Sequence, residues 1–144
     1  MKIKLLDKKD ILENYKDIEI LFRNFNLLNM EEVIKKLIDF LEIEMCTCLG
    51  AYQNDKLIGF LWAFKREFAG ERRYHINYFS VKKEKHNQGI GKLLLSELKK
   101  IAEKEKIKKI DLNVDIDNKK AKWFYKKNRF KEEKTLLCLE LGEE

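Results

Sequence analysis

One segment near the middle of the chain limits the possible folds more than any other. A β-rich run ends at Val81, a polar loop follows, and a helix opens at Gly89 and Gly91. The chain contains no proline and only six glycines, so two glycines this close together carry information. Another apolar, β-rich run, Ile107–Val114, follows the helix. This order predicts a strand–helix–strand crossover within a mixed α/β sheet.

The glycines at the start of this helix favour a phosphate-binding site. Backbone N–H groups in the first helical turn have no partners inside the helix and lie at the positive end of its dipole. A pyrophosphate can accept several of these N–H groups, and glycine lets it approach the backbone. The segment is neither a Walker loop nor the six-residue dinucleotide fingerprint. Taken alone, it is equally compatible with a glycine-marked loop that binds no ligand.

Hydrophobic periodicity predicts the remaining elements, because strands repeat every two residues and helices every three to four. We expect strands over Met1–Leu6, Met45–Tyr52, Leu57–Phe64, Tyr74–Val81, Ile107–Val114 and Thr135–Leu141, and helices over Asp10–Phe25, Asn29–Leu41, Gly89–Lys106 and from Asp117 or Asn118 to Asn128. The predicted order is β-α-α-β-β-β-α-β-α-β, in one domain over residues 1–144.

Two short polar segments predict local structure within this order. Asn29 is a candidate N-cap, with Glu32 three residues later as its capping-box partner. The interval Gln53–Lys56 has the length and the residue types of a hairpin turn.

The charge of the chain is a modest basic excess of +6, from 31 basic and 25 acidic residues. Because the basic residues are interleaved with acidic ones, we favour a solvated surface over a nucleic-acid-binding face. A small positive excess also fits a polyphosphate ligand.

The cysteines predict neither a disulfide framework nor a metal centre. Cys46, Cys48 and Cys138 are three in number, so they cannot all pair within the chain, and His75 and His86 are the only histidines that could complete a metal site. We expect reduced thiols in a cytoplasmic protein. The start of the chain does not resemble a leader peptide, and no apolar run approaches the ~20 residues of a membrane span.

A second segment, near the end of the chain, strengthens the interpretation of the first. Helical spacing places Asn118, Ala121 and Tyr125 on one face, flanked by Phe124 and Asn128. In isolation, this pattern is explained by packing against a sheet. Together, the two segments resemble the two cofactor motifs of the GNAT superfamily of N-acetyltransferases.

The resemblance is specific in both sequence and spacing. The first family motif, Arg or Gln followed by x-x-Gly-x-Gly/Ala, corresponds to His86, Gly89 and Gly91. The second, Asn-x-x-Ala-x-x-Phe/Leu-Tyr-x-x-x-Gly-Phe, corresponds to Asn118, Ala121, Phe124, Tyr125 and Phe130. Two residues depart from the pattern: His86 replaces Arg or Gln, and Arg129 replaces the glycine before Phe130. We therefore expect Asn128 to supply the left-handed residue of that turn.

The resemblance implies acetyl-CoA as cofactor and an amine as acetyl acceptor, with no metal. Backbone groups of the strand end at Phe79, Ser80 and Val81 are implied to bind the pantetheine arm. The implied cofactor site further includes His86, Asn87, Gln88, Gly89, Ile90, Gly91, Lys92, Asn118, Ala121, Phe124 and Tyr125.

The resemblance also implies that Tyr125 protonates the departing thiolate. A base must deprotonate the amine, because an amine pKa of about 10 keeps it charged at neutral pH. His75 is one candidate, although a strand histidine with a purely structural role is equally compatible with the sequence. Glu67 and Glu71 are alternatives that would act through water.

Two other functions stay open at this stage: a catalytically inactive CoA-binding protein, and a small nucleic-acid-binding protein. The acceptor is equally open among peptide amino termini, lysines, polyamines and amino sugars. The first two helices and the segment Phe64–Tyr74 are expected to shape its pocket. The aromatic residues Phe22, Phe25, Trp62 and Phe68 either line that pocket or, as we favour, belong to the core. Homodimers are common in the family, and the sequence does not fix the oligomeric state.

Overall fold

The computed structural model describes residues 1–23 and 29–142 and confirms the predicted mixed α/β fold. The elements in chain order are β1 (Lys2–Leu5), α1 (Lys8–Glu13), α2 (Tyr15–Phe22), α3 (Met30–Glu42), β2 (Cys46–Gln53), β3 (Lys56–Phe68), β4 (Glu71–Val81), the 3₁₀ turn η1 (Lys83–Lys85), α4 (Ile90–Lys104), β5 (Ile110–Leu112) and α5 (Lys119–Lys127). The chain divides into two compact units, Met1–Asn113 and Val114–Glu144.

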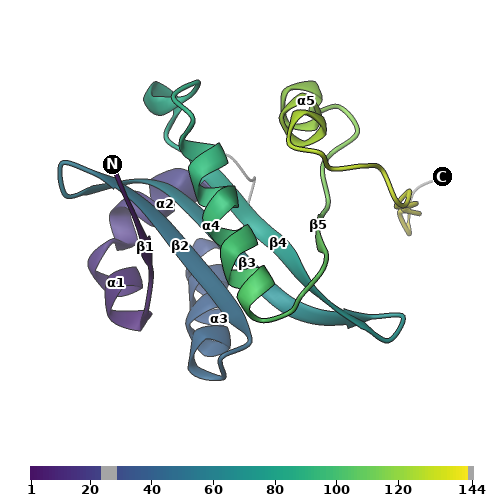
Figure 1. Cartoon of the computed structure of the whole chain (residues 1–144), viewed down its shortest axis with the longest axis horizontal. Coiled ribbons are helices and arrows are strands. Elements are labelled where there is room, and N and C mark those ends of the chain that lie inside the picture. The colour runs from purple at the N-terminus through teal and green to yellow at the C-terminus, as the bar shows by residue number, and fades with distance from the viewer. Residues whose placement is uncertain (24–28, 143–144) are drawn as a thin grey trace. The chain divides into compact units, whose positions relative to one another are not determined.

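The first unit is built on one five-stranded sheet whose strands lie in the order β1-β2-β3-β4-β5. The pairs from β1 to β4 are antiparallel, and β4 pairs with β5 in parallel across the helix α4. In Figure 1, α1, α2 and α3 cover one face of the sheet and α4 covers the other. The predicted strand–helix–strand crossover is therefore present.

The largest core cluster lies between the sheet and the helices α1, α2 and α3. Phe22 of α2 packs edge-to-face on Phe60 of β3, with ring centroids 5.4 Å apart. Phe22 and Trp62 are almost fully buried, so both belong to the core, as the sequence analysis favoured. Phe25 lies outside the described residues.

Two tight turns connect the central strands. Asn54 and Asp55 both have positive φ, 52° and 62°, as do Ala69 and Gly70, at 51° and 79°. Two successive residues of this kind are typical of type I′ turns, which match the twist of a hairpin. The predicted turn at Gln53–Lys56 is confirmed. The second turn keeps β3 and β4 paired as far as Phe68 and Glu71, so both strands are longer than predicted.

The first helical region differs from its prediction. Instead of one helix over Asp10–Phe25, it forms α1 and α2 with a break at Asn14. The Asn14 side-chain amide donates to the Asp10 carbonyl at 2.8 Å and to the Tyr52 hydroxyl at 3.1 Å. An asparagine that binds backbone groups in this way competes with helix continuation. At α3, Asn29 caps the helix as predicted, accepting a hydrogen bond from the Glu32 N–H at 3.3 Å.

The second unit contains α5, the short segment that leads into it from Val114, and an irregular segment that follows it. The expected strand over Thr135–Leu141 is not formed, since residues 131–140 have no regular secondary structure. Leu136, Leu137 and Leu139 are each more than 80% exposed. A strand needs a neighbouring strand for its backbone hydrogen bonds, and the described residues of the second unit contain no strand with which this segment could pair.

Within residues 1–23 and 29–142, no helix is both long and apolar enough to cross a membrane. No group of three or more histidine, cysteine or acidic side chains in that part of the chain could hold a metal ion.

Candidate active site

The loop between β4 and α4 is held by several contacts at its first residue. The Lys82 backbone N–H donates to the Ile58 carbonyl of β3 at 2.8 Å. The Lys82 ammonium group lies 2.7 Å from a carboxylate oxygen of Asp17 on α2, and Lys82 is largely buried. This loop therefore begins from a fixed point that is tied to both the sheet and a helix.

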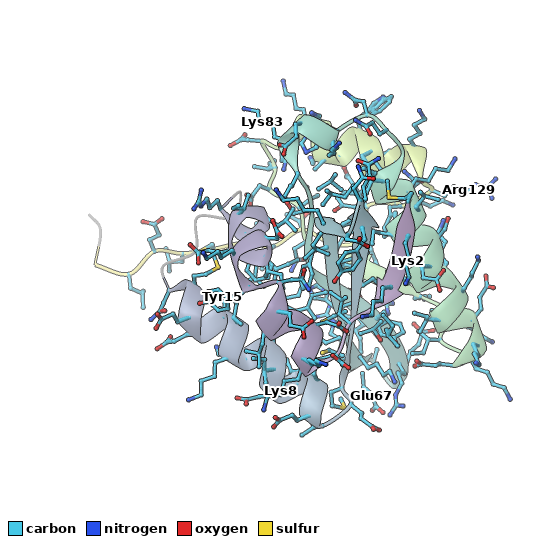
Figure 2. The ribbon with its side chains drawn as sticks, turned by 90° about the vertical axis from the view of Figure 1, so that its left-hand side faces the viewer. Lys2, Lys8, Tyr15, Glu67, Lys83 and Arg129 are labelled. Atoms are coloured by element: carbon cyan, nitrogen blue, oxygen red, sulfur yellow. The ribbon has the colours of Figure 1, made fainter. Side chains whose placement is uncertain are left out.

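The loop is also braced from within by His86. The His86 ring nitrogen Nε2 donates to the Val81 carbonyl oxygen at 2.8 Å, and the His86 backbone N–H donates to the Lys83 carbonyl at 3.3 Å. The side chain that replaces the Arg or Gln of the family motif thus contacts the protein's own backbone. Figure 2 shows Lys83 of this loop and Glu67 of β3 at opposite ends of the first unit.

The amino end of α4 has the backbone geometry that a phosphate cradle requires. Gly89 is the N-cap with φ 77°, and Asn87 also has positive φ, 63°. The first intrahelical hydrogen bond runs from the Leu93 N–H to the Gly89 carbonyl at 3.0 Å, so the N–H groups of residues 90–92 precede it. A Cβ added to Gly89 would contact nothing within 4 Å. Glycine is therefore favoured here by its backbone conformation and not by crowding within the protein.

A second glycine, which the sequence analysis did not single out, brings α4 close to the sheet. A Cβ on Gly59 of β3 would lie 3.1 Å from a methyl carbon of Leu94 and 3.2 Å from one of Ile90. The missing side chain lets the first turns of α4 approach β3 closely. A glycine inside a β-rich run is the signal that could have indicated this contact.

The strand β4 contains an irregularity next to its last β5 partner. Trp62 is opposite Tyr78, whereas Ala63 is opposite Ile76, so Asn77 is the extra residue of a β-bulge. The pairing of β4 with β5 ends at Ile76, opposite Leu112, while β4 continues to Val81. The strand end at Phe79, Ser80 and Val81 therefore lies beyond the bulge and leads directly into the loop.

His75 lies on β4, close to this bulge, and has a carboxylate partner. Residues in register share a face of the sheet, and Phe64, His75 and Asp111 form one such row across β3, β4 and β5. The His75 Nδ1 atom lies 2.5 Å from the Asp111 Oδ1 atom. The His75 ring centroid is 5.2 Å from that of Phe64. Sequence reasoning missed Asp111, because the parallel register that brings it to His75 has no local signal.

Two arginines surround the Asp111 carboxylate. The Arg66 Nη2 atom donates to both carboxylate oxygens, at 3.2 and 3.3 Å, and the Arg73 Nη1 atom donates to Oδ2 at 3.3 Å. Burial raises the pKa of Asp111, but the hydrogen bond from His75 and the charge of Arg66 lower it by more, so the pKa lies below its usual value. Asp111 is therefore an ionised acceptor at neutral pH.

The two glutamates considered as bases are placed less favourably. Glu71 forms ion pairs with Arg73 at 3.2 Å and with Lys109 at 3.3 Å. The hydrogen bond from Lys109 holds the pKa of Glu71 below its usual value, which makes it a weaker base. Glu67 is exposed, at the end of the sheet away from the loop that contains Lys83 (Figure 2).

In the second unit, Asn118 and Tyr125 organise the two ends of α5. The Asn118 side-chain oxygen accepts the Ala121 N–H at 3.1 Å, so Asn118 is the helix N-cap. The Tyr125 ring packs edge-to-face on Phe124 at 5.4 Å and on Phe130 at 5.3 Å. Burial raises the pKa of the Tyr125 hydroxyl to about 12. This hydroxyl is therefore protonated at neutral pH.

The turn after α5 corrects one prediction. Arg129 has φ 71°, whereas Asn128 has φ −93°, so Arg129 and not Asn128 is the left-handed residue. The Phe130 N–H donates to the Tyr125 carbonyl at 2.9 Å and the Arg129 N–H to the Lys126 carbonyl at 3.0 Å. These two bonds, with the contact between the Phe130 and Tyr125 rings, define a Schellman motif. The motif forms without its usual glycine, because these hydrogen bonds and the ring contact offset the backbone strain of a positive φ at Arg129.

The structure groups the predicted site residues by unit. The first unit contains His75 and the cofactor candidates Phe79, Ser80, Val81, His86, Asn87, Gln88, Gly89, Ile90, Gly91 and Lys92. The second unit contains Asn118, Ala121, Phe124 and Tyr125.

Comparisons with known proteins give a consistent assignment. The profile of the Acetyltransferase (GNAT) family matches residues 14–130. A solved structure of a probable acetyltransferase is similar over 100% of both chains, with 20% identity and a TM-score of 0.82. A predicted acetyltransferase from Clostridium acetobutylicum, solved with acetyl-CoA, is similar over 97% of this chain and 96% of its own, with 19% identity and a TM-score of 0.80.

An aminoglycoside 6′-N-acetyltransferase from Acinetobacter haemolyticus is also similar, over 100% of both chains, with 17% identity and a TM-score of 0.80. At these identities, the structural likeness establishes the fold. A comparison with curated protein sequences gave no significant match. The family profile covers most of the chain, so this protein belongs to the GNAT family of acetyltransferases.

Proposed function

We propose that this acetyltransferase transfers the acetyl group of acetyl-CoA to an amine nitrogen of its acceptor. The observation that carries the proposal is the amino end of α4, where Gly89 adopts φ 77° behind a braced loop. Because the loop is already fixed by Lys82 and His86, little ordering is needed before a pyrophosphate accepts the helix N–H groups.

The chain's residues fit acetyl-CoA in chemistry as well as in backbone geometry. In the first unit, residues 86–92 would hold the pyrophosphate, and the strand end at Phe79, Ser80 and Val81 would bind the pantetheine arm. Lys83, Lys85 and Lys92 add positive charge around the cradle. In the second unit, Asn118, Ala121, Phe124 and Tyr125 are also proposed to contact acetyl-CoA. Acetyl-CoA supplies the activated acetyl thioester.

Two side chains are proposed to move protons. His75 takes a proton from the acceptor amine through its Nε2 atom, because Nδ1 is engaged by Asp111. Tyr125 gives a proton to the thiolate of the leaving CoA, and its raised pKa keeps the hydroxyl protonated until it is needed. The raised pKa of Tyr125 therefore supports its proposed role as the acid.

A panel of amines, assayed with acetyl-CoA by free-thiol release, tests this function. The panel includes a peptide amino terminus, lysine, a polyamine and an amino sugar, and mass spectrometry locates the acetyl group on the product. We expect thiol release that depends on one class of amine. Acetyl-CoA binding without transfer to any of them would favour the alternative, a CoA-binding protein without catalysis.

Three further expectations stay predictions: one acetyltransferase domain over residues 1–144, a cytoplasmic location, and a homodimer of the kind common in the family.

A further inference from the structure

We infer that Asp111 is a positioning residue that fixes His75 in the tautomer with Nδ1 protonated, so that the Nε2 lone pair is the basic site. The inference rests on the proposed function, in which His75 deprotonates the acceptor amine. It concerns a residue outside both cofactor motifs.

The tautomer follows from what each atom can do in a hydrogen bond. An ionised carboxylate only accepts hydrogen bonds, so the His75 Nδ1 atom, 2.5 Å from Asp111 Oδ1, must be the donor. In a neutral imidazole, a proton on Nδ1 leaves Nε2 with a lone pair. His75 is 8% exposed and its ring is packed against Phe64, so the ring is held in one orientation.

Arg66 and Arg73 hold the Asp111 carboxylate in the orientation in which it contacts His75. Arg73 occupies Oδ2, and Arg66 bridges both oxygens, which leaves one direction of Oδ1 for His75. Arginine has no acceptor atom, so neither guanidinium can satisfy a group that donates. Among the described residues of the first unit, the charged groups around His75 are Asp111, Arg66 and Arg73, with Glu71 and Lys109 attached at the edge of the cluster.

The other histidine of the chain provides an internal reference. The His86 Nε2 atom lies 2.8 Å from the Val81 carbonyl oxygen, which also can only accept. Neutral His86 must therefore carry its proton on Nε2. The only two histidines of the sequence are accordingly held in opposite tautomers.

Two-bond ¹H–¹⁵N correlation spectra of the full chain, labelled with ¹⁵N-histidine, test this directly. The spectra are recorded at about pH 9, where a histidine with the usual pKa of about 6.5 is neutral. We expect one ring with Nδ1 protonated and one with Nε2 protonated, and the variant His86→Gln assigns the second. A His75 ring with its proton on Nε2 would overturn the inference, whether or not any acceptor amine has been found.

The variant Asp111→Asn tests whether the tautomer of His75 determines the rate of acetyl transfer. Arg73 donates to Oδ2 alone, whereas Arg66 donates to both oxygens, so the new amide oxygen is drawn to the Oδ2 position and the amide N–H points toward His75 Nδ1. Nδ1 must then accept, the proton moves to Nε2, and the base is lost. We expect kcat to fall by about 10²-fold or more while KM changes little.

The control is Asp55→Asn, which removes an exposed carboxylate in the β2–β3 turn and leaves His75 untouched. We expect wild-type kcat and an unchanged His75 spectrum in this variant. A loss of activity in Asp111→Asn without a change of tautomer would mean that Asp111 has a merely structural role, and would overturn the inference. A changed tautomer with wild-type kcat would equally overturn it, because His75 would then not be the base.

Discussion

Lys82 and Asp17 join the end of strand β4 to helix α2 through an ion pair of 2.7 Å. The Lys82 side chain is only 7% exposed and that of Asp17 is 22% exposed, so water screens this pair far less than a surface pair. The contact fixes the first residue of the loop between β4 and α4. It also connects the face of the sheet that α1, α2 and α3 cover, on which His75 lies beside Phe64, to the loop that precedes α4.

We expect Asp17→Asn to lower the free energy of unfolding by about 1–3 kcal/mol, because it leaves a largely buried ammonium without its counter-charge. Thermal or urea denaturation measures the change. Glu19→Gln is the matched control, since Glu19 is on the same helix but forms an exposed pair with Arg23 at 3.9 Å. Equal stability of the two variants would contradict the expectation.

Substitutions at Gly89 and Gly70 distinguish the effect of backbone strain on stability from the effect of the loop on acetyl-CoA affinity. Their φ angles are 77° and 79°, and a Cβ at either position would contact nothing within 4 Å. Alanine should therefore destabilise both sites by a similar amount, about 1–2 kcal/mol. We expect Gly89→Ala to weaken acetyl-CoA binding as well, and the bulkier Gly89→Val by more than tenfold, or about 1.4 kcal/mol.

Calorimetry with acetyl-CoA distinguishes the two positions. Gly70→Ala, in the turn between β3 and β4, should bind acetyl-CoA as the wild type does. If a folded Gly89→Val protein bound acetyl-CoA with undiminished affinity, the amino end of α4 would not be the phosphate-binding site.

Replacing Tyr125 by Phe keeps the ring contacts with Phe124 and Phe130 and deletes the hydroxyl. We expect kcat to fall by about 10²-fold with acetyl-CoA affinity nearly unchanged, because only the proton donor is lost. Steady-state kinetics with the best amine, together with calorimetry, measure both quantities. An unchanged kcat, with chemistry shown to be rate-limiting, would exclude Tyr125 as the acid.

The pH dependence of kcat follows from the upward shift of the Tyr125 pKa. Since burial raises it to about 12, the hydroxyl loses its proton, and its ability to act as an acid, only as the pH approaches that value. The wild type should therefore show no loss of kcat from Tyr125 ionisation between neutral pH and about pH 11. A decline in that interval that disappears in Tyr125→Phe would contradict the raised pKa.

Arg129→Gly should stabilise the protein by about 0.5–1 kcal/mol, because glycine adopts φ 71° without the cost of a Cβ. Asn128→Gly is the contrasting variant. Asn128 has φ −93° and its side chain donates to the Phe124 carbonyl at 2.8 Å, so its replacement should destabilise. Thermal denaturation of both variants checks the opposite signs.

The parts of the fold that could be predicted depend on residues close together in the chain. The caps at Gly89 and Asn118 and the turn after Gln53 each follow from a few neighbouring residues. The break at Asn14 could not be predicted in the same way, since it depends on a hydrogen bond to Tyr52, far along the chain.

The same distinction applies to the candidate site. The glycines of the cradle are visible in the sequence, because backbone conformation limits the residue type. Asp111 is not, because its role depends on the parallel register of β4 and β5, which the crossover through α4 sets. The left-handed Arg129 was missed for a third reason: its strain is offset by the contact between Tyr125 and Phe130.

The strand order also bears on how the chain folds. The strands β2, β3 and β4 form two successive hairpins with two-residue turns, so their contacts close short loops and can form early. β1 and β5 must instead join across intervening helices, at a higher entropic cost of loop closure. Because β5 pairs at three positions, its amides should exchange with solvent through local opening before those of β3 do. β5 therefore joins the sheet after β2, β3 and β4 have paired. Since β5 carries Asp111, the hydrogen bond between His75 and Asp111 would form only after most of the sheet is in place.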